Sequence, residues 1–187
     1  YYRVKAADGY TYYMAEALLD KVLGGLAHDD TPAYEITGRF TGKELEYKEY
    51  EPLFDFAVGK LDKPAWRVIC DDYVTMTDGS GIVHIAPAFG EDDNRVCKQN
   101  GIAFVNLVDT QGCLCKETKW PGVFVKKADP LVLADLQERG LLFSAPQFTH
   151  DYPFCWRCDT PLLYYARPTW FIRMTALKDN LVRNNRT

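Results

Sequence analysis

Apolar and polar positions alternate in short runs along most of the chain, a pattern that favours short β-strands over long helices. Two aromatic-rich runs, residues 1–6 and 10–14, flank an Asp8-Gly9 pair, so the sequence predicts a hairpin at the start of the chain. A short helix is expected over residues 15–23, because the apolar spacing changes there and two glycines follow.

Further short runs continue through the middle of the chain. Strands are predicted at residues 34–40, 45–47, 66–70, 73–76, 82–85, 104–108, 122–126 and 141–143. Helices are predicted at 91–99, where acidic residues crowd the first turn, at 130–139, which starts with a proline and precedes a glycine, and at 175–184. Many short strands with few helices predict an α+β fold, in which peripheral short helices surround a β-barrel-like core.

The composition of the chain changes after Phe148, where aromatic residues, prolines and cysteines become frequent. Residues 1–148 are therefore expected to form the core of one domain, and residues 149–187 a connector towards a neighbouring domain. The chain begins with Tyr1 rather than methionine and ends within a polar run. Both ends are expected to be cuts in a longer protein.

Composition excludes several classes of protein. Of the 187 residues, 47% are hydrophobic and 26% charged, as in ordinary globular domains. The net charge of -4 argues against general attraction to nucleic acid, so any such contact must come from a local site or another domain. No apolar run approaches the roughly 18 residues of a membrane span. The six cysteines are unevenly spaced and suit a reducing cytosol, so a cytoplasmic location is expected.

The most informative stretch runs Asp78-Gly-Ser-Gly-Ile-Val-His-Ile-Ala-Pro-Ala-Phe-Gly-Glu-Asp-Asp93. On a strand, His84 and Ala86 would share one face, and the small side chain of Ala86 leaves room for a ligand beside the imidazole. The following loop brings Asp92 and Asp93 to a helix start, where a carboxylate either caps the helix or binds a cation. The ordinary alternative to a ligand site is an N-capping aspartate with a core histidine.

Residues 79–93 resemble the signature of the editing domain that is inserted in isoleucyl-tRNA synthetases, a class I family. The related valyl and leucyl enzymes lack histidine at the position of His84 and carry an Ala-His-Asp run after the proline. Residues 150–161 and 168–173 are similar to the segment by which the chain of this family returns to its catalytic domain. The two matches stand in the expected order, and the editing domain of a valyl or leucyl enzyme is the alternative within the same class.

The resemblance implies hydrolysis of the ester that joins valine, attached in error, to the 3′-terminal adenosine of tRNA(Ile). Valine is one methylene smaller than isoleucine, and for this family a second, smaller site is known to clear the product that the first accepts. By the resemblance, Asp93 is expected to hold the α-ammonium group, His84 to exclude isoleucine by bulk, and Ala86 to leave space. Asp92 is the alternative to Asp93 if the register of the acidic pair differs.

The resemblance also implies what lies outside these residues. Editing would need no cofactor, whereas a catalytic domain elsewhere in the parent enzyme would use ATP and magnesium to ligate isoleucine. The family pocket includes a Thr-rich stretch that we do not find here, so the chain is expected to be weak or inactive alone. The expected partners are the valine-bearing 3′ end of tRNA(Ile) and the rest of the synthetase, with no membrane and a monomeric fragment.

Cys155 and Cys158 form a CxxC motif that reads as half of a zinc knuckle, since structural zinc takes four ligands. By the resemblance, the other two ligands would lie upstream of this chain. His150, or Cys113 with Cys115, could complete a site within it, and a pair of free thiols is the simpler alternative. A non-catalytic zinc-binding module is the competing function, and it would require four ligands inside the chain and a dispensable Asp93.

Overall fold

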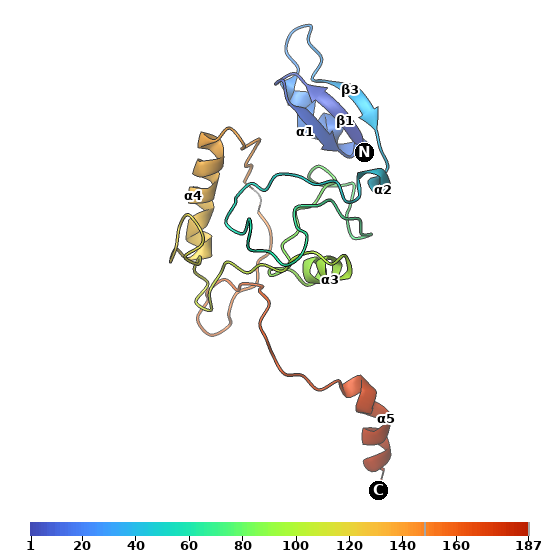
Figure 1. Ribbon diagram of the computed structural model, residues 1–187, viewed down its shortest axis with the longest axis vertical. Coiled ribbons are helices and arrows are strands. Elements are labelled where there is room, and N and C mark those ends of the chain that lie inside the picture. The colour runs from blue at the N-terminus through green and yellow to red at the C-terminus, as the bar shows by residue number, and fades with distance from the viewer. Residues whose placement is uncertain (148, 187) are drawn as a thin grey trace.

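The computed structural model describes residues 1–147 and 149–186. Phe148, the predicted domain boundary, and Thr187, the last residue of the predicted connector, lie outside the described residues. The sheet and α1 (Leu19–Leu23) occupy one end of the molecule, and α5 (Met174–Asn184) stands at the opposite end (Figure 1). Extended segments with α3 (Glu91–Gln99) and α4 (Val125–Glu138) form the middle.

Three antiparallel strands form the sheet, in the order β2-β1-β3. They are β1 (Tyr2–Ala6), β2 (Thr11–Met14) and β3 (Tyr34–Arg39). The predicted hairpin is confirmed, with Tyr2 opposite Met14. Gly9 turns the chain between β1 and β2 with φ +90°, a conformation that glycine adopts without steric cost.

Within the described residues, one small hydrophobic core lies between the sheet and the helical segment that follows β2. This segment consists of η1 (Glu16–Leu18), α1 (Leu19–Leu23) and η2 (Gly24–Leu26). The core consists of Val4, Ala6, Met14, Leu19 and Leu23, of which Val4 and Leu23 are completely buried. The helix predicted over 15–23 is confirmed in position. The glycine pair does not end it, because a 3-10 turn continues through both glycines.

The prediction of a barrel-like core is wrong, because the sheet is open and no further strand is formed in the described residues. The content of helix and strand remains consistent with an α+β protein. Instead of the strand expected at 45–47, the short helix α2 (Gly42–Leu45) forms, because Thr41 and Glu44 make a capping box. Elsewhere only isolated bridges occur, such as Glu49 opposite Arg67. β-Branched residues favour extended backbone, but they do not supply the partner that a ladder requires.

The three longer helices follow the pattern of the sequence to different degrees. The predictions for α3 (Glu91–Gln99) and α5 (Met174–Asn184) are confirmed. α4 (Val125–Glu138) starts five residues before the predicted position, so that Pro130 lies inside it. Proline has no amide proton, so Pro130 cannot donate the helical hydrogen bond to the carbonyl of Lys126. It lies in the first half of α4.

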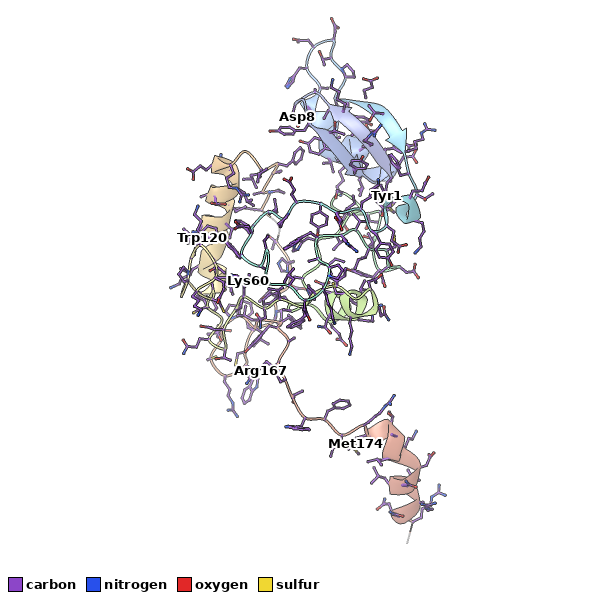
Figure 2. The ribbon with its side chains drawn as sticks, in the orientation of Figure 1. Tyr1, Asp8, Lys60, Trp120, Arg167 and Met174 are labelled. Atoms are coloured by element: carbon purple, nitrogen blue, oxygen red, sulfur yellow. The ribbon has the colours of Figure 1, made fainter. Side chains whose placement is uncertain are left out.

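The first part of the connector, up to Ala166, contacts residues of the preceding segments, and the part after it extends away from them. The amide of Ala166 donates to the carbonyl of Ala88 at 2.8 Å, and Leu163 lies against Gly112. Between Arg167 and Met174 the chain is extended and its side chains stand clear of the body (Figure 2), and Trp170 is fully exposed. None of the described residues of the connector is buried.

Candidate functional site

We call the three-stranded sheet and the helical segment 16–26 the N-terminal layer. A hollow of about 760 Å³ lies between this layer and α3. Its walls come from the start of the chain and from the segments 42–50, 67–74 and 81–85, with Val96 contributed by α3. His84 belongs to this wall, while Ala86 and Asp93 do not. The structure therefore divides the predicted site into a wall residue, His84, and a hydrogen-bonded pair at the start of α3, Ala86 and Asp93.

His84 is exposed rather than buried, so it is not a core histidine. Ile82, Val83 and Ile85 line the same hollow as His84. The strand predicted over residues 82–85 is not formed, so the shared face predicted for His84 and Ala86 loses its basis. Side chains alternate between two faces only where backbone pairing keeps a strand pleated, and this segment has no paired strand beside it.

Asp93 is the third residue of α3, and its side chain turns back out of the helix. One carboxylate oxygen, Oδ2, accepts a hydrogen bond from the backbone amide of Ala86 at 2.9 Å. Oδ1 accepts no hydrogen bond from any described residue. The N-cap position belongs to Gly90, which makes no side-chain capping bond, so the main contact of Asp93 lies outside its own helix. The carboxylate thus has one fixed oxygen and one available oxygen.

Gly90 is what allows this approach. A Cβ atom at Gly90 would stand 2.9 Å from Cγ and 3.0 Å from Oδ2 of Asp93, closer than such atoms pack. The backbone of Gly90 is extended, with φ -147°, so the requirement for glycine here is space and not backbone conformation. Any larger residue would push the carboxylate away from the Ala86 amide.

The two acids at the start of α3 have different surroundings. Asp92 is exposed and pairs with Arg95 at 3.3 Å, one turn later in the helix. Arg95 also binds both carboxylate oxygens of Asp71 at 3.1 and 3.2 Å. The hydrogen bond from Arg95 is the main reason why the pKa of Asp71 lies below its ordinary value. Asp92 is therefore engaged by a cation, whereas Asp93 has no cationic partner among the described residues.

The loop between His84 and α3 is held at several points. The amide of Phe89 donates to the carbonyl of Ala86 at 2.9 Å, which closes a tight turn. Asn94 donates its side-chain amide to the carbonyl of Pro87 at 2.9 Å, and the connector reaches the carbonyl of Ala88. These bonds fix the Ala86 amide in the direction of Asp93.

The start of the same stretch is fastened to the N-terminal layer. The backbone of Ala15 donates to the carbonyl of Ser80 at 2.8 Å, and the hydroxyl of Tyr1 donates to the carbonyl of Gly81 at 2.9 Å. Gly81 has φ +73°, and a Cβ atom there would stand 2.5 Å from the Cβ of Ala15. Glycine is thus required at position 81 for both conformation and space.

Cys155 and Cys158 lie at one tight turn of the connector. The amide of Asp159 donates to the carbonyl of Cys155 at 2.8 Å, and the Cys158 thiol lies 3.0 Å from the hydroxyl of Thr160. The hydrogen bond with Thr160 is the main cause that lowers the pKa of Cys158, and the bond with Cys155 adds to it. In residues 1–147 and 149–186, no group of three or more His, Cys, Asp or Glu side chains is placed to hold a metal ion. The donors present fit half of a zinc site.

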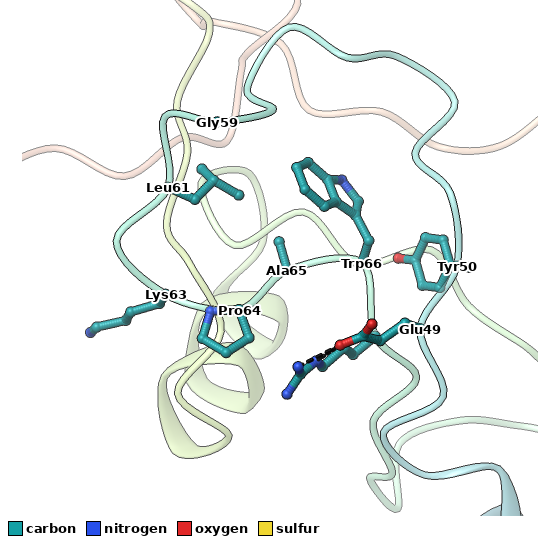
Figure 3. Close-up of a pocket in the computed structure, with 9 residues that line it drawn as sticks. Glu49, Tyr50, Gly59, Leu61, Lys63, Pro64, Ala65 and Trp66 are labelled. Carbon is teal, nitrogen blue, oxygen red and sulfur yellow. Dashed lines mark hydrogen bonds and ion pairs between the residues drawn. The ribbon is translucent and has the colours of Figure 1, made fainter.

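A second, smaller hollow of about 350 Å³ lies between residues 49–50 and 59–67 (Figure 3). Trp66 extends into it, with Tyr50 and Leu61 nearby, and the ion pair of Arg67 with Glu49 forms one edge. Trp66 has φ +52°, which is strained for a bulky aromatic residue. None of the predicted site residues lies here. Sequence patterning gave no signal for this hollow, because the conformation of Trp66 depends on its neighbours in space.

Comparison with known proteins identifies the family. No protein-family model matches the chain. It is 51% identical over 178 residues to the isoleucine–tRNA ligase of Clostridium kluyveri, covering 95% of the chain and 16% of that relative. The chain is homologous to one segment of isoleucine–tRNA ligases. The ligase of Streptomyces coelicolor is 45% identical over 97% of the chain and 17% of the relative, and the cytoplasmic ligase of Arabidopsis thaliana is 44% identical over 88% and 14%.

The predicted relationship to isoleucyl-tRNA synthetases is thereby confirmed. The chain spans about one sixth of the length of the curated relatives it matches, since each match covers 14% to 17% of the relative. The names of these relatives describe the activity of whole proteins. In the described part of the chain, no helix has both the length and the apolar character needed to cross a membrane.

Proposed function

We propose that this segment hydrolyses valine from tRNA(Ile) that has been charged in error, within a parent enzyme that ligates isoleucine to the same tRNA with ATP and magnesium. The observation that carries the proposal is the Asp93 carboxylate. One of its oxygens is fixed by the Ala86 amide, and the other has no hydrogen-bond partner among the described residues.

A carboxylate held in this way suits the α-ammonium group of an aminoacyl ester. A charge-assisted hydrogen bond to an ammonium group is stronger than a neutral one, and Asp93 is half-buried, which reduces competition from water. A free amino group would thus be required for binding. The bond from Ala86 sets the direction of the available oxygen, so the ammonium group and the ester carbon next to it would be positioned together.

Selectivity between amino acids would come from the wall of the hollow. His84 lines it, and its imidazole would limit the size of the side chain that can enter, while the methyl group of Ala86 leaves space beside Asp93. We assign no side chain as general base. A water molecule positioned beside the ester, with help from a ribose hydroxyl of the tRNA, is the nucleophile we propose.

The remaining contacts with tRNA would come from the parent enzyme. The chain carries a net charge of -4, which does not favour binding of a polyanion. The hollow beside His84 is also open to solvent along exposed apolar side chains, Ile82 and Val83 among them. We therefore propose that the chain acts with the rest of the synthetase and that the isolated chain is a monomer with little activity of its own.

We further propose that Cys155 and Cys158 supply two of the four ligands of a structural zinc ion in the parent enzyme. The two cysteines flank one tight turn, and no group of three or more possible ligands is found within the described residues, which is consistent with two ligands supplied from elsewhere. Bound zinc would hold the connector in a fixed path and take no part in hydrolysis. Metal analysis of the parent enzyme and its Cys155→Ser variant tests this, and equal zinc content in both would contradict it.

Substitution of Asp93 tests the proposed function. Asp93→Ala in the parent enzyme is expected to reduce clearance of Val-tRNA(Ile) to the spontaneous rate, because the ammonium group loses its partner. Isoleucine activation, measured by pyrophosphate exchange, should stay unchanged.

Asp92→Ala is the matched control, since it removes the neighbouring acid that pairs with Arg95. This variant should still clear Val-tRNA(Ile). If Asp93→Ala edits at the rate of the parent enzyme, Asp93 has only a structural role. If the Asp92 variant alone loses editing, the two acids have exchanged their proposed roles.

A further inference from the structure

The hydroxyl of Tyr73 is buried and has no hydrogen-bond partner among the described residues. Almost all buried polar groups in proteins are paired, so each exception calls for an explanation. Sequence reasoning did not single out Tyr73, which lies in an ordinary aromatic and β-branched run. Its position in the structure suggests a partner that it reaches only when the site is occupied.

Tyr73 is connected to α3 through its neighbour Asp71. The neighbouring Asp71 is bound through both of its oxygens to Arg95 of α3, and it also accepts from the amide of Tyr73 at 3.4 Å. Tyr73 lines the same hollow as Val96. Val96 stands one helical turn after Asp93, on the same side of α3. Tyr73 thus lies towards the side of α3 that carries Asp93, although Asp93 itself does not line the hollow.

The nearby acids differ in their capacity to accept another hydrogen bond. Both oxygens of Asp71 and one oxygen of Asp92 are engaged by Arg95. Oδ1 of Asp93 accepts no hydrogen bond from any described residue. Burial is the main cause that raises the pKa of Tyr73, and the charge of Asp93 comes next, ahead of Asp71, Cys97 and Asp92. Among the charged neighbours, Asp93 thus acts most strongly on this hydroxyl.

We propose that Tyr73 is a positioning residue for Asp93, whose hydroxyl donates to Oδ1 of that carboxylate when the amine of the substrate is bound. This inference rests on the proposed editing function. A carboxylate oxygen can accept two hydrogen bonds, so Oδ1 can take the phenol and the ammonium group together. Ala86 and Tyr73 would then fix the two oxygens of Asp93 from opposite ends.

The chemical advantage of tyrosine is that it is neutral. Arg95 also orients carboxylates, those of Asp71 and Asp92, but its positive charge offsets theirs. A phenol holds a carboxylate in place without offsetting its charge, so Asp93 keeps the full negative charge with which it would bind a cation. The structure thus separates the acids that join segments from the acid that binds a ligand.

The test compares two stable analogues bound to the parent synthetase. In one, valine is joined to the 3′ position of adenosine through an amide. In the other, a 3-methylbutanoyl group replaces valine, so only the amine is missing. Tyr73→Phe is expected to weaken binding of the first analogue about tenfold, the size expected for loss of a hydrogen bond to a charged group. Binding of the second should not change, because Asp93 has no ammonium group to hold there.

Two measurements separate this role from a general effect on the fold. Tyr73→Phe removes a buried hydroxyl that has no partner, so its thermal stability should equal or exceed that of the parent. Tyr10→Phe removes an exposed hydroxyl from the β1–β2 turn and should bind both analogues like the parent. A loss of affinity for both analogues in Tyr73→Phe would mean that the hydroxyl acts on the hollow as a whole and not through Asp93, which would overturn the inference.

The outcome for Asp93→Ala distinguishes this inference from the function on which it rests. If Asp93→Ala weakens binding of the valine analogue and Tyr73→Phe does not, the inference about Tyr73 is overturned and the proposed function stands. If Asp93→Ala binds the valine analogue as the parent does, the proposed function fails and the inference fails with it.

Discussion

The N-terminal layer and residues 66–90 contain similar kinds of residue but are stabilised in different ways. In the layer, β1 pairs with a strand on each side, and Val4 and Leu23 are completely buried. Residues 66–90 are also rich in aromatic and β-branched residues, yet they form no paired strand, and Ile82 and Val83 remain 45% and 47% exposed. The residues proposed for chemistry lie in or next to the second region.

The difference shows where this protein obtains its order. The layer is stabilised by many cooperative contacts, whereas residues 66–90 are fixed by a few specific ones. They include the close approach of Gly81 to Ala15, the ion pair of Asp71 with Arg95, and the hydrogen bond from Ala86 to Asp93. Removal of a contact should therefore affect stability in the first region and site geometry in the second.

The largest effect is expected in the layer. Leu23→Ala should reduce the free energy of unfolding by about 3 kcal/mol, because it leaves a cavity in the only sizeable core of the described residues. Ile82→Ala removes an exposed side chain of similar size and should cost less than about 1 kcal/mol. Urea unfolding of the two variants gives both values, and equal losses would show that residues 66–90 are as well packed as the layer.

A smaller loss of stability is expected where the two regions meet. Gly81→Ala should cost about 2 kcal/mol, because it combines an unfavourable left-handed backbone with a Cβ atom placed 2.5 Å from Ala15. Gly59→Ala is the matched control, with φ +74° and no atom within 4 Å, so only the backbone cost of about 1 kcal/mol applies. Thermal unfolding distinguishes the two. Identical losses would mean that the contact with Ala15 relaxes freely.

An effect on function without a comparable loss of stability is expected at Gly90. Gly90→Ala should displace the Asp93 carboxylate from the Ala86 amide and reduce hydrolysis of Val-tRNA(Ile) by the parent enzyme about tenfold, or about 1.4 kcal/mol. Gly25→Ala has open space around the new methyl group and should edit normally. The assay is deacylation at limiting enzyme concentration. Full activity of the Gly90 variant would show that the position of Asp93 tolerates this change.

The smallest effect is expected for α4, in which Asp135 forms ion pairs with Lys119 and Arg139. Hydrogen bonds from Lys119 and then Arg139 hold the pKa of Asp135 below its ordinary value. The stabilisation from Asp135 is therefore fully present above the ordinary aspartate pKa of about 4, and it is lost as the pH falls through the lowered folded value. Asp135→Asn should be slightly less stable than the parent at pH 7 and lose less stability on acidification.

The control for this prediction is Asp129→Asn, an exposed acid on the same helix. Urea unfolding between pH 7 and pH 2 should give the same acid dependence for this variant as for the parent. If Asp135→Asn shows the parent dependence too, its ion pairs with Lys119 and Arg139 do not contribute to folding.

The sequence by itself determined the local elements and the family. The Asp8-Gly9 hairpin, the helix over residues 91–99 and the resemblance carried by residues 79–93 could all be read from the order of residues, because a tight turn, a charged helix start and a motif depend on near neighbours. The residues proposed for the site, His84, Ala86 and Asp93, were found in the same way.

Tertiary structure alone decided which extended runs became strands and which acid was left available. The run at 82–85 resembles a strand in composition, but strand formation needs a partner that the local sequence does not contain. Asp92 and Asp93 are adjacent and chemically identical, and only Arg95 on one side and the Ala86 amide on the other make them different. Contacts between residues that are distant along the chain, such as that of Asp71 with Arg95 of α3, leave no local pattern from which they could be predicted.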